Sequence, residues 1–190
     1  SVLLFHAEFK NFTGGFVGVD VFFVISGYLI TKTILKQASN GSFSYYAFYE
    51  KRMRRILPVL FFVSLVCIPF SLYFMTPLDL KHFSQGLFGS TAFVSNFLFW
   101  SQSGGYFDTG SIWKPLHHTW SLAVEEQFYL VHPVFILLIS GKSRRFQKVL
   151  VLIVMAISFV FSVIYINYDA EGNFYLLPSR IWELFAGAFI

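Results

Sequence analysis

The run VLVLIVMAISFVFSVIYINY at residues 149 to 168 contains no Asp, Glu, Lys or Arg. A helix needs about 20 consecutive apolar residues to cross the hydrocarbon core of a bilayer, so this run predicts a transmembrane helix. Residues 56 to 78 and 82 to 107 also lack these four residue types and predict two more. Residues 16 to 31 predict a fourth helix, with Asp20 near its start, and residues 127 to 141 predict a shorter fifth.

Composition places the whole chain in the same class. Of the 190 residues, 56% are hydrophobic and 13% are charged, and the mean hydropathy is +0.63. We therefore expect an all-α fold, a polytopic transmembrane helix bundle with about six to seven membrane segments. The chain begins and ends inside apolar runs. Residues 1 to 190 are expected to be a single membrane domain that is truncated at both ends.

Charge and cysteine content exclude other classes. The net charge of +4 does not indicate a nucleic-acid partner, because the basic residues lie in loops between apolar segments, where membrane topology places them. Cys67 is the only cysteine, which excludes an internal disulfide and a thiolate cluster. The spacing of the other possible ligands does not predict a metal site.

Two loops are strongly basic, residues 32 to 55 and residues 142 to 148. The positive-inside rule predicts that both face the cytoplasm. Three apolar segments separate them, and three crossings would put the loops on opposite sides. One solution is that residues 118 to 141 form a re-entrant or broken helix, because this segment carries polar groups. The alternative is that the shorter loop violates the rule.

The polar stretch HHTWSLAVEEQFY at residues 117 to 129 leads directly into an apolar segment. On a helix, His118, Ser121, Glu125 and His132 share one stripe, whereas Glu126 points about 100° away from Glu125. This geometry favours Glu125 as the carboxylate that shares a cavity with His118, with Glu126 at the lipid interface. Ionisable groups at membrane depth usually serve function. The alternative is a structural hydrogen-bond cluster.

Other polar residues are sparse. His6 lies in the first apolar run, where an interfacial or hydrogen-bonded structural role is the simpler interpretation. The basic group at residues 51 to 55 is either a topology anchor or a phosphate-binding site, to which arginine forks are suited. Arg180 and Glu183 are three residues apart, a spacing that favours a structural ion pair on a helix.

Four segments together resemble one known family. They are GGFVGVDVFFVISGYLIT (residues 14 to 31), FYEKRMRRILP (48 to 58), HTWSLAVEEQFYLVHP (118 to 133) and LPSRIWELFAGA (177 to 188). In this order they are similar to the acyltransferase-3 family of multi-pass bacterial membrane enzymes, particularly the branch that O-acetylates surface polysaccharide. The last segment resembles members that carry a further extracytoplasmic SGNH-type esterase domain. The resemblance implies a bundle of about ten helices, of which this chain would be the N-terminal two-thirds.

The resemblance also implies a set of site residues. The family's essential first-helix histidine matches His6, whereas the arginine that precedes that histidine in the family would lie before Ser1. The family's acidic, histidine and carboxylate positions match Asp20, His118 and Glu125, and its paired arginines on a cytoplasmic loop match Arg52 and Arg55.

The expected reaction is transfer of an acyl group, most simply acetyl, from acyl-CoA to a glycan hydroxyl. His6 would act as general base, Asp20 or Glu125 would orient its imidazole, and Arg52 and Arg55 would hold the CoA phosphates. The acceptor would be a lipid-linked or surface glycan of O-antigen, exopolysaccharide or peptidoglycan type. Membrane lipid is the other expected partner, and no permanently bound cofactor is expected. The resemblance implies the bacterial cytoplasmic (inner) membrane as the location.

Two other functions remain open. A proton-coupled secondary transporter would also place histidines and carboxylates at membrane depth, around a broken helix. Such proteins usually contain internal repeats, and the sequence shows none to inspection. A non-catalytic membrane scaffold would leave the cost of the buried ionisable residues unexplained.

Overall fold

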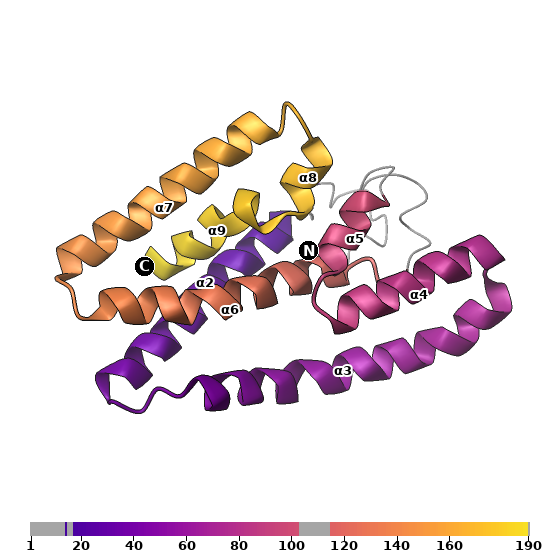
Figure 1. Ribbon diagram of the computed structural model, residues 1–190, viewed down its shortest axis with the longest axis horizontal. Helices are drawn as coiled ribbons and strands as arrows, with labels where there is room; N and C mark the ends of the chain where they lie inside the picture. The colour runs from indigo at the N-terminus through magenta and orange to yellow at the C-terminus, as the bar shows by residue number, and fades with distance from the viewer. Residues whose placement is uncertain (1–13, 15–16, 103–114, 190) are drawn as a thin grey trace.

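The computed structural model describes residue 14, residues 17 to 102 and residues 115 to 189. Within these residues every regular element is a helix, which confirms the predicted all-α class (Figure 1). The elements are α2 (Val17–Ser39), α3 (Tyr45–Phe74), α4 (Pro77–Thr91), α5 (Ser95–Ser101), α6 (Thr119–Ser140), α7 (Arg144–Tyr165), α8 (Ala170–Tyr175) and α9 (Leu177–Phe189).

Four helices of the described part, α2, α3, α6 and α7, are long and apolar enough to cross a membrane. The 22 residues of α6 and of α7 correspond to about 33 Å each, the thickness of the hydrocarbon core. The start of α7 is fixed by Ser143, whose hydroxyl accepts a hydrogen bond from the backbone N–H of Phe146. Ser44 caps α3 in the same way through Ala47.

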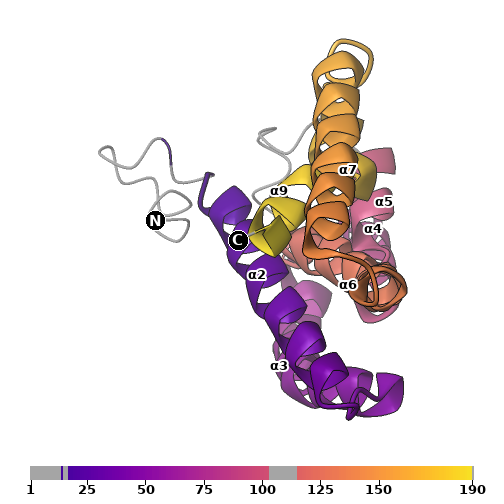
Figure 2. The ribbon, with the colours of Figure 1, turned by 90° about the vertical axis from the view of Figure 1, so that its left-hand side faces the viewer.

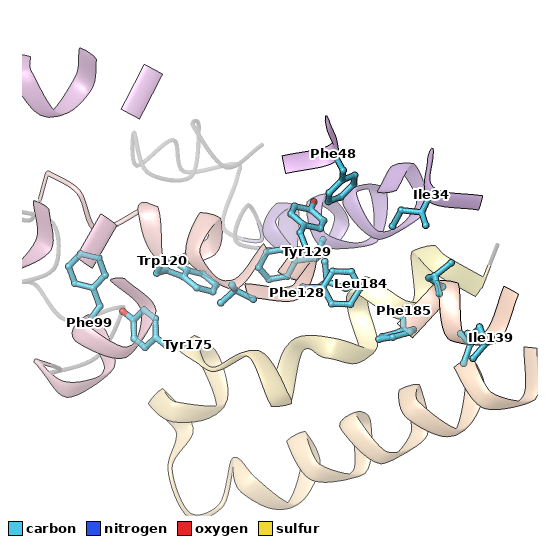
Figure 3. Packing of buried hydrophobic residues seen from close by; sticks show 14 residues of the cluster. Ile34, Phe48, Phe99, Trp120, Phe128, Tyr129, Ile139, Tyr175, Leu184 and Phe185 are labelled. Atoms are coloured by element: carbon cyan, nitrogen blue, oxygen red, sulfur yellow. The ribbon is translucent and has the colours of Figure 1, made fainter. Parts of the chain in front are cut away.

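Helix α6 lies at the centre of the bundle. Within its most apolar window 56% of the residues are buried, against 17% for α3 and 11% for α7. The apolar core gathers along this helix (Figure 3). It contains Trp120, Phe128 and Tyr129 of α6, Ile34 of α2, Tyr175 of α8, and Leu184 and Phe185 of α9.

Helix α9 packs between α2 and α7 (Figure 2). The approach to α2 is so close that a Cβ atom on Gly27 would overlap the backbone carbonyl of Leu184. A Cβ atom on Gly187 would overlap the carbonyl of Val24 in the same way. Glycines at both contact points therefore let the two backbones touch, as small residues do where membrane helices cross.

The charge-free segment predicted to be one helix at 82 to 107 is broken in its described part, residues 82 to 102. It is divided between α4, which has 15 residues, and α5, which has seven. The chain turns at Phe93, whose φ of 55° is in the left-handed region that non-glycine residues rarely occupy. Gln127 of α6 holds this turn, because its amide donates to the Phe93 carbonyl oxygen at 2.9 Å and to Asn96 Oδ1 at 2.8 Å.

The break between α4 and α5 explains how two basic regions separated by three apolar segments can face the same side of the membrane, but not in the way the sequence predicted. The prediction placed a re-entrant or broken helix at residues 118 to 141, but α6 is continuous there from Thr119 to Ser140. The break lies instead between α4 and α5, within residues 82 to 102. The predicted basic loop 32 to 55 is mostly helical, because α2 extends to Ser39 and α3 begins at Tyr45. Two long helices, α3 and α6, separate the short turn after α2 from the short turn after α6, and both turns lie at the same end of the bundle (Figure 1).

Cysteine accessibility tests this topology. In a cysteine-free background of the full-length protein, Ser42→Cys and Lys142→Cys should react with a membrane-impermeant maleimide from the same side. Tyr168→Cys, in the turn after α7, should react from the opposite side, because α7 is long enough to cross. Labelling of positions 42 and 142 from opposite sides would contradict the arrangement.

Candidate active site

Glu125 lies buried on α6, with 4% of its surface exposed. The hydroxyl of Tyr129, one turn further along the same helix, donates to Glu125 Oε1 at 3.2 Å. Ser26 of α2, which is also buried, lies beside this carboxyl group. Contacts from two helices therefore fix the direction of the carboxyl group, as a catalytic or positioning group requires.

Glu126 is also buried, with 7% exposed, and this corrects the prediction that it lies at the lipid interface. Its Oε1 accepts from Arg52 Nη2 at 2.8 Å and from Arg52 Nε at 3.2 Å. The helical pattern gave the right direction relative to Glu125, but it could not reveal that α3 covers this second face of α6. Arg52 also stacks on Tyr129, with its Cζ atom 3.5 Å from the ring centroid.

The two arginines expected to bind phosphate have different surroundings. Arg52 is held by Glu126, with 17% of its side chain exposed, whereas Arg55 is exposed on the next turn of α3. Glu126 is 14 residues from the end of α6, so Arg52 meets α6 about 21 Å from the basic turn that follows Ser140. Arg52 and Arg55 therefore lie beside the middle of α6 and not at the end of the bundle where α6 finishes.

His118 does not join Glu125. It is exposed at the N-cap of α6, about 10 Å along the helix axis from Glu125. His132, the C-terminal member of the predicted stripe on α6, does face α2, because its Nε2 lies 2.7 Å from Oγ1 of Thr31. The neighbouring His117 is the buried member of the histidine pair, and its Nε2 is 3.1 Å from the hydroxyl oxygen of Tyr175. Sequence reasoning did not select His117.

Asp20 lies in the first turn of α2, where Oδ1 accepts a hydrogen bond from Arg180 Nη1 at 2.9 Å. The same nitrogen lies 2.6 Å from Glu183 Oε1, which confirms the predicted ion pair at this i,i+3 spacing. Sequence spacing could not indicate that Arg180 also binds Asp20, 160 positions earlier. His6, the predicted base, lies outside the described residues.

Asp169 shapes the turn beside this cluster. Its Oδ1 accepts from the Gly172 backbone N–H at 2.7 Å, and its Oδ2 accepts from the Trp100 indole at 2.8 Å. These hydrogen bonds, first of all that from Gly172, hold the pKa of Asp169 below its usual range. The carboxylate caps the short helix α8 and fixes it against α5.

Comparisons with known proteins agree on one family. The profile described as an acyltransferase domain matches residues 1 to 190. The peptidoglycan O-acetyltransferase OatA of Listeria monocytogenes is 35% identical, over 98% of this chain and 31% of that protein. The putative peptidoglycan O-acetyltransferase YrhL of Bacillus subtilis is 34% identical, over 98% and 30%. The O-acetyltransferase OatA of Staphylococcus aureus is 31% identical, over 100% and 32%.

This chain therefore spans about a third of the length of these curated relatives. No solved structure matches it. The profile covers the whole chain, including all four sequence segments that resemble the family. With its membrane-length helices and the buried ionisable groups of α6, the chain belongs to the acyltransferase-3 family of multi-pass membrane acyltransferases.

Proposed function

We propose that this chain is the membrane part of an O-acyltransferase that moves an acetyl group from acetyl-CoA to a hydroxyl of a cell-surface glycan, in the bacterial cytoplasmic membrane. The observation that carries the proposal is the pair of carboxyl groups, Glu125 and Glu126, buried next to Arg52 in a helix long enough to span. Such groups are costly in a membrane segment and are usually retained for function.

The relatives favour a glycan of the peptidoglycan type as acceptor. Two of the three compared relatives carry peptidoglycan O-acetyltransferase in their names, and the third is named an O-acetyltransferase. We extend the peptidoglycan acceptor to this chain as part of the proposal, in preference to O-antigen or exopolysaccharide.

The chemical step needs a base. The oxygen of a sugar hydroxyl attacks the thioester carbonyl carbon, a C–O bond forms, the C–S bond breaks and the CoA thiolate leaves. A sugar hydroxyl is a weak nucleophile at neutral pH, so a base near neutral pKa must take its proton. In this direct transfer His6 is the proposed base, and the proton finally passes to the thiolate. In the alternative route the imidazole first attacks the thioester and the thiolate leaves; the sugar hydroxyl then attacks the acyl-histidine, which releases the imidazole.

Glu125 is the proposed positioning group. Its carboxyl is held by the Tyr129 hydroxyl, so it can orient an imidazole or a substrate hydroxyl without being reorganised during the reaction. Asp20 is the alternative orienting carboxylate, but in the structure it already accepts from Arg180. His118, exposed at the start of α6, is the further proposed site histidine.

The basic first turns of α3 are the proposed binding region for the CoA phosphates. Lys51 and Arg55 are exposed there, so their charges can meet an anion, whereas Arg54 is paired with Glu50 at 2.8 Å. Arg52 shares the region, but Glu126 already occupies two of its donors. Arg55 should therefore supply more of the phosphate binding than Arg52 does, with Arg52 fixing the helix that carries it.

A transfer assay tests the function. Membranes that contain the full-length protein should move label from radiolabelled acetyl-CoA to isolated peptidoglycan strands, in an alkali-labile ester. His6→Ala should reduce the rate by about 10²-fold or more, because a general base contributes that much, without changing the amount of inserted protein. Proton-coupled uptake without labelled glycan would instead support a transporter.

Glu125→Gln and Glu126→Gln should fail in different ways. Glu125→Gln replaces the carboxyl group with an amide of the same size, which can still accept the hydrogen bond from Tyr129. The protein should therefore fold while its transfer rate per folded molecule falls about 10²-fold. Glu126→Gln leaves Arg52 without its partner, and breaking a buried pair costs about 3–5 kcal/mol, so the amount of folded protein should fall. Equal losses of folded protein in both variants would remove Glu125 from the site.

A further inference from the structure

Pro133 lies inside the membrane-length helix α6, about two turns after the two buried carboxyl groups. A proline has no backbone N–H, so it cannot donate to the carbonyl oxygen four residues earlier in the helix. In α6 that oxygen belongs to Tyr129. Both residues are buried, and Tyr129 is 2% exposed. A carbonyl oxygen without a donor is costly in such surroundings, because neither water nor lipid can satisfy it there.

Tyr49, near the start of α3, supplies a donor to this oxygen. Its hydroxyl donates to the Tyr129 carbonyl oxygen at 2.9 Å and to the Leu130 carbonyl oxygen at 3.2 Å. Tyr49 itself is half-buried, so the hydrogen bond is partly shielded from competing solvent. The hydroxyl therefore takes the place of the backbone N–H that Pro133 lacks, and it attaches α3 to this turn of α6.

The rest of Tyr129 contacts the candidate active site. Its hydroxyl donates to Glu125 Oε1 at 3.2 Å, and the Cζ atom of Arg52 lies 3.5 Å from the centroid of its ring. Neighbouring groups thus contact the carbonyl, the ring and the hydroxyl of this one residue. A tyrosine side chain has only two main torsion angles, so holding its backbone and ring also fixes the position of its hydroxyl.

We infer that Tyr49 is a positioning residue of the proposed active site, which keeps Glu125 in place through Tyr129. The inference rests on the proposed function, because it concerns the carboxyl group that orients the reacting partners in that reaction. The Tyr49 hydroxyl donates to backbone oxygens of α6, so its effect on Glu125 passes through Tyr129. The pairing with Pro133 explains why a hydroxyl is needed at this position of α3.

Melting temperatures of the full-length protein in detergent test whether the hydroxyl replaces the missing N–H. Tyr49→Phe leaves the Tyr129 carbonyl oxygen without a donor, so the melting temperature should fall. Pro133→Ala returns an N–H to the position four residues after Tyr129. In that background Tyr49→Phe should cause little further fall. The matched control is Tyr46→Phe, which should melt like the wild type because Tyr46 is 79% exposed on the same part of α3.

The transfer assay tests the positioning role, with rates expressed per folded molecule. Tyr49→Phe and Tyr129→Phe should each lower kcat about tenfold or more, because a small displacement of an orienting group has such an effect. The KM for acetyl-CoA should stay the same in both, whereas Arg55→Ala should raise it. The double tyrosine variant should be no slower than the slower single variant, since both changes affect the same contact to Glu125.

Several outcomes would overturn the inference. One is a Tyr49→Phe variant that keeps the wild-type kcat, even if less of it folds, because the role of the hydroxyl would then be structural alone. Another is an equal loss of kcat from Tyr49→Phe with and without Pro133→Ala. Independent, multiplied losses in the double tyrosine variant would also count against it. So would a Tyr49→Phe protein that fails to fold in both backgrounds.

The two measurements separate this inference from the proposed function. A wild type that transfers no acetyl group would overturn the proposed function, while the melting temperatures would still show whether Tyr49 replaces the N–H absent from Pro133. If the wild type transfers acetyl groups and Tyr49→Phe does so at the same kcat, the proposed function stands and the positioning role fails.

Discussion

The pairing of Arg52 with Glu126 is the interaction on which the arrangement of the bundle depends. Hydrocarbon cannot solvate an isolated charge, so a carboxylate in a membrane-spanning helix needs a partner. Arg52 supplies it at 2.8 Å and also stacks on Tyr129. Tyr49 adds a hydrogen bond to the Tyr129 carbonyl oxygen at 2.9 Å. These polar contacts attach α3 to α6, because most of the apolar surface of α3 faces away from the described core.

Because α6 is central, two different helices contact the two faces that carry its buried carboxyl groups. Glu125 faces α2, whereas Glu126 faces α3, so adjacent residues of one helix serve different neighbours. At the start of α6, His117 Nε2 lies 3.1 Å from the hydroxyl oxygen of Tyr175 in α8. The exposed basic residues of α3 suit an anionic ligand.

The long apolar helices could be predicted from the sequence, because a bilayer requires an uninterrupted apolar run and residues 149 to 168 provide one. The division of residues 82 to 102 could not, because hydropathy does not register a turn at Phe93 that Gln127 stabilises from another helix. Helical spacing identified Glu125 as facing a different direction from Glu126. It could not identify Arg52 as the partner of Glu126, or Arg180 as the partner of Asp20, because these contacts join positions 74 and 160 apart.

A charge exchange between Arg52 and Glu126 tests the central claim most directly. The amount of folded full-length protein would be measured by fluorescence-detected size exclusion for Arg52→Glu, Glu126→Arg and the double variant. Each single change places two like charges together in a largely buried site, so each should lose most of the folded protein. The double variant should recover a large part of it, since the opposite charges face each other again. Single variants that fold like the wild type, or a double variant no better than either single one, would contradict the account.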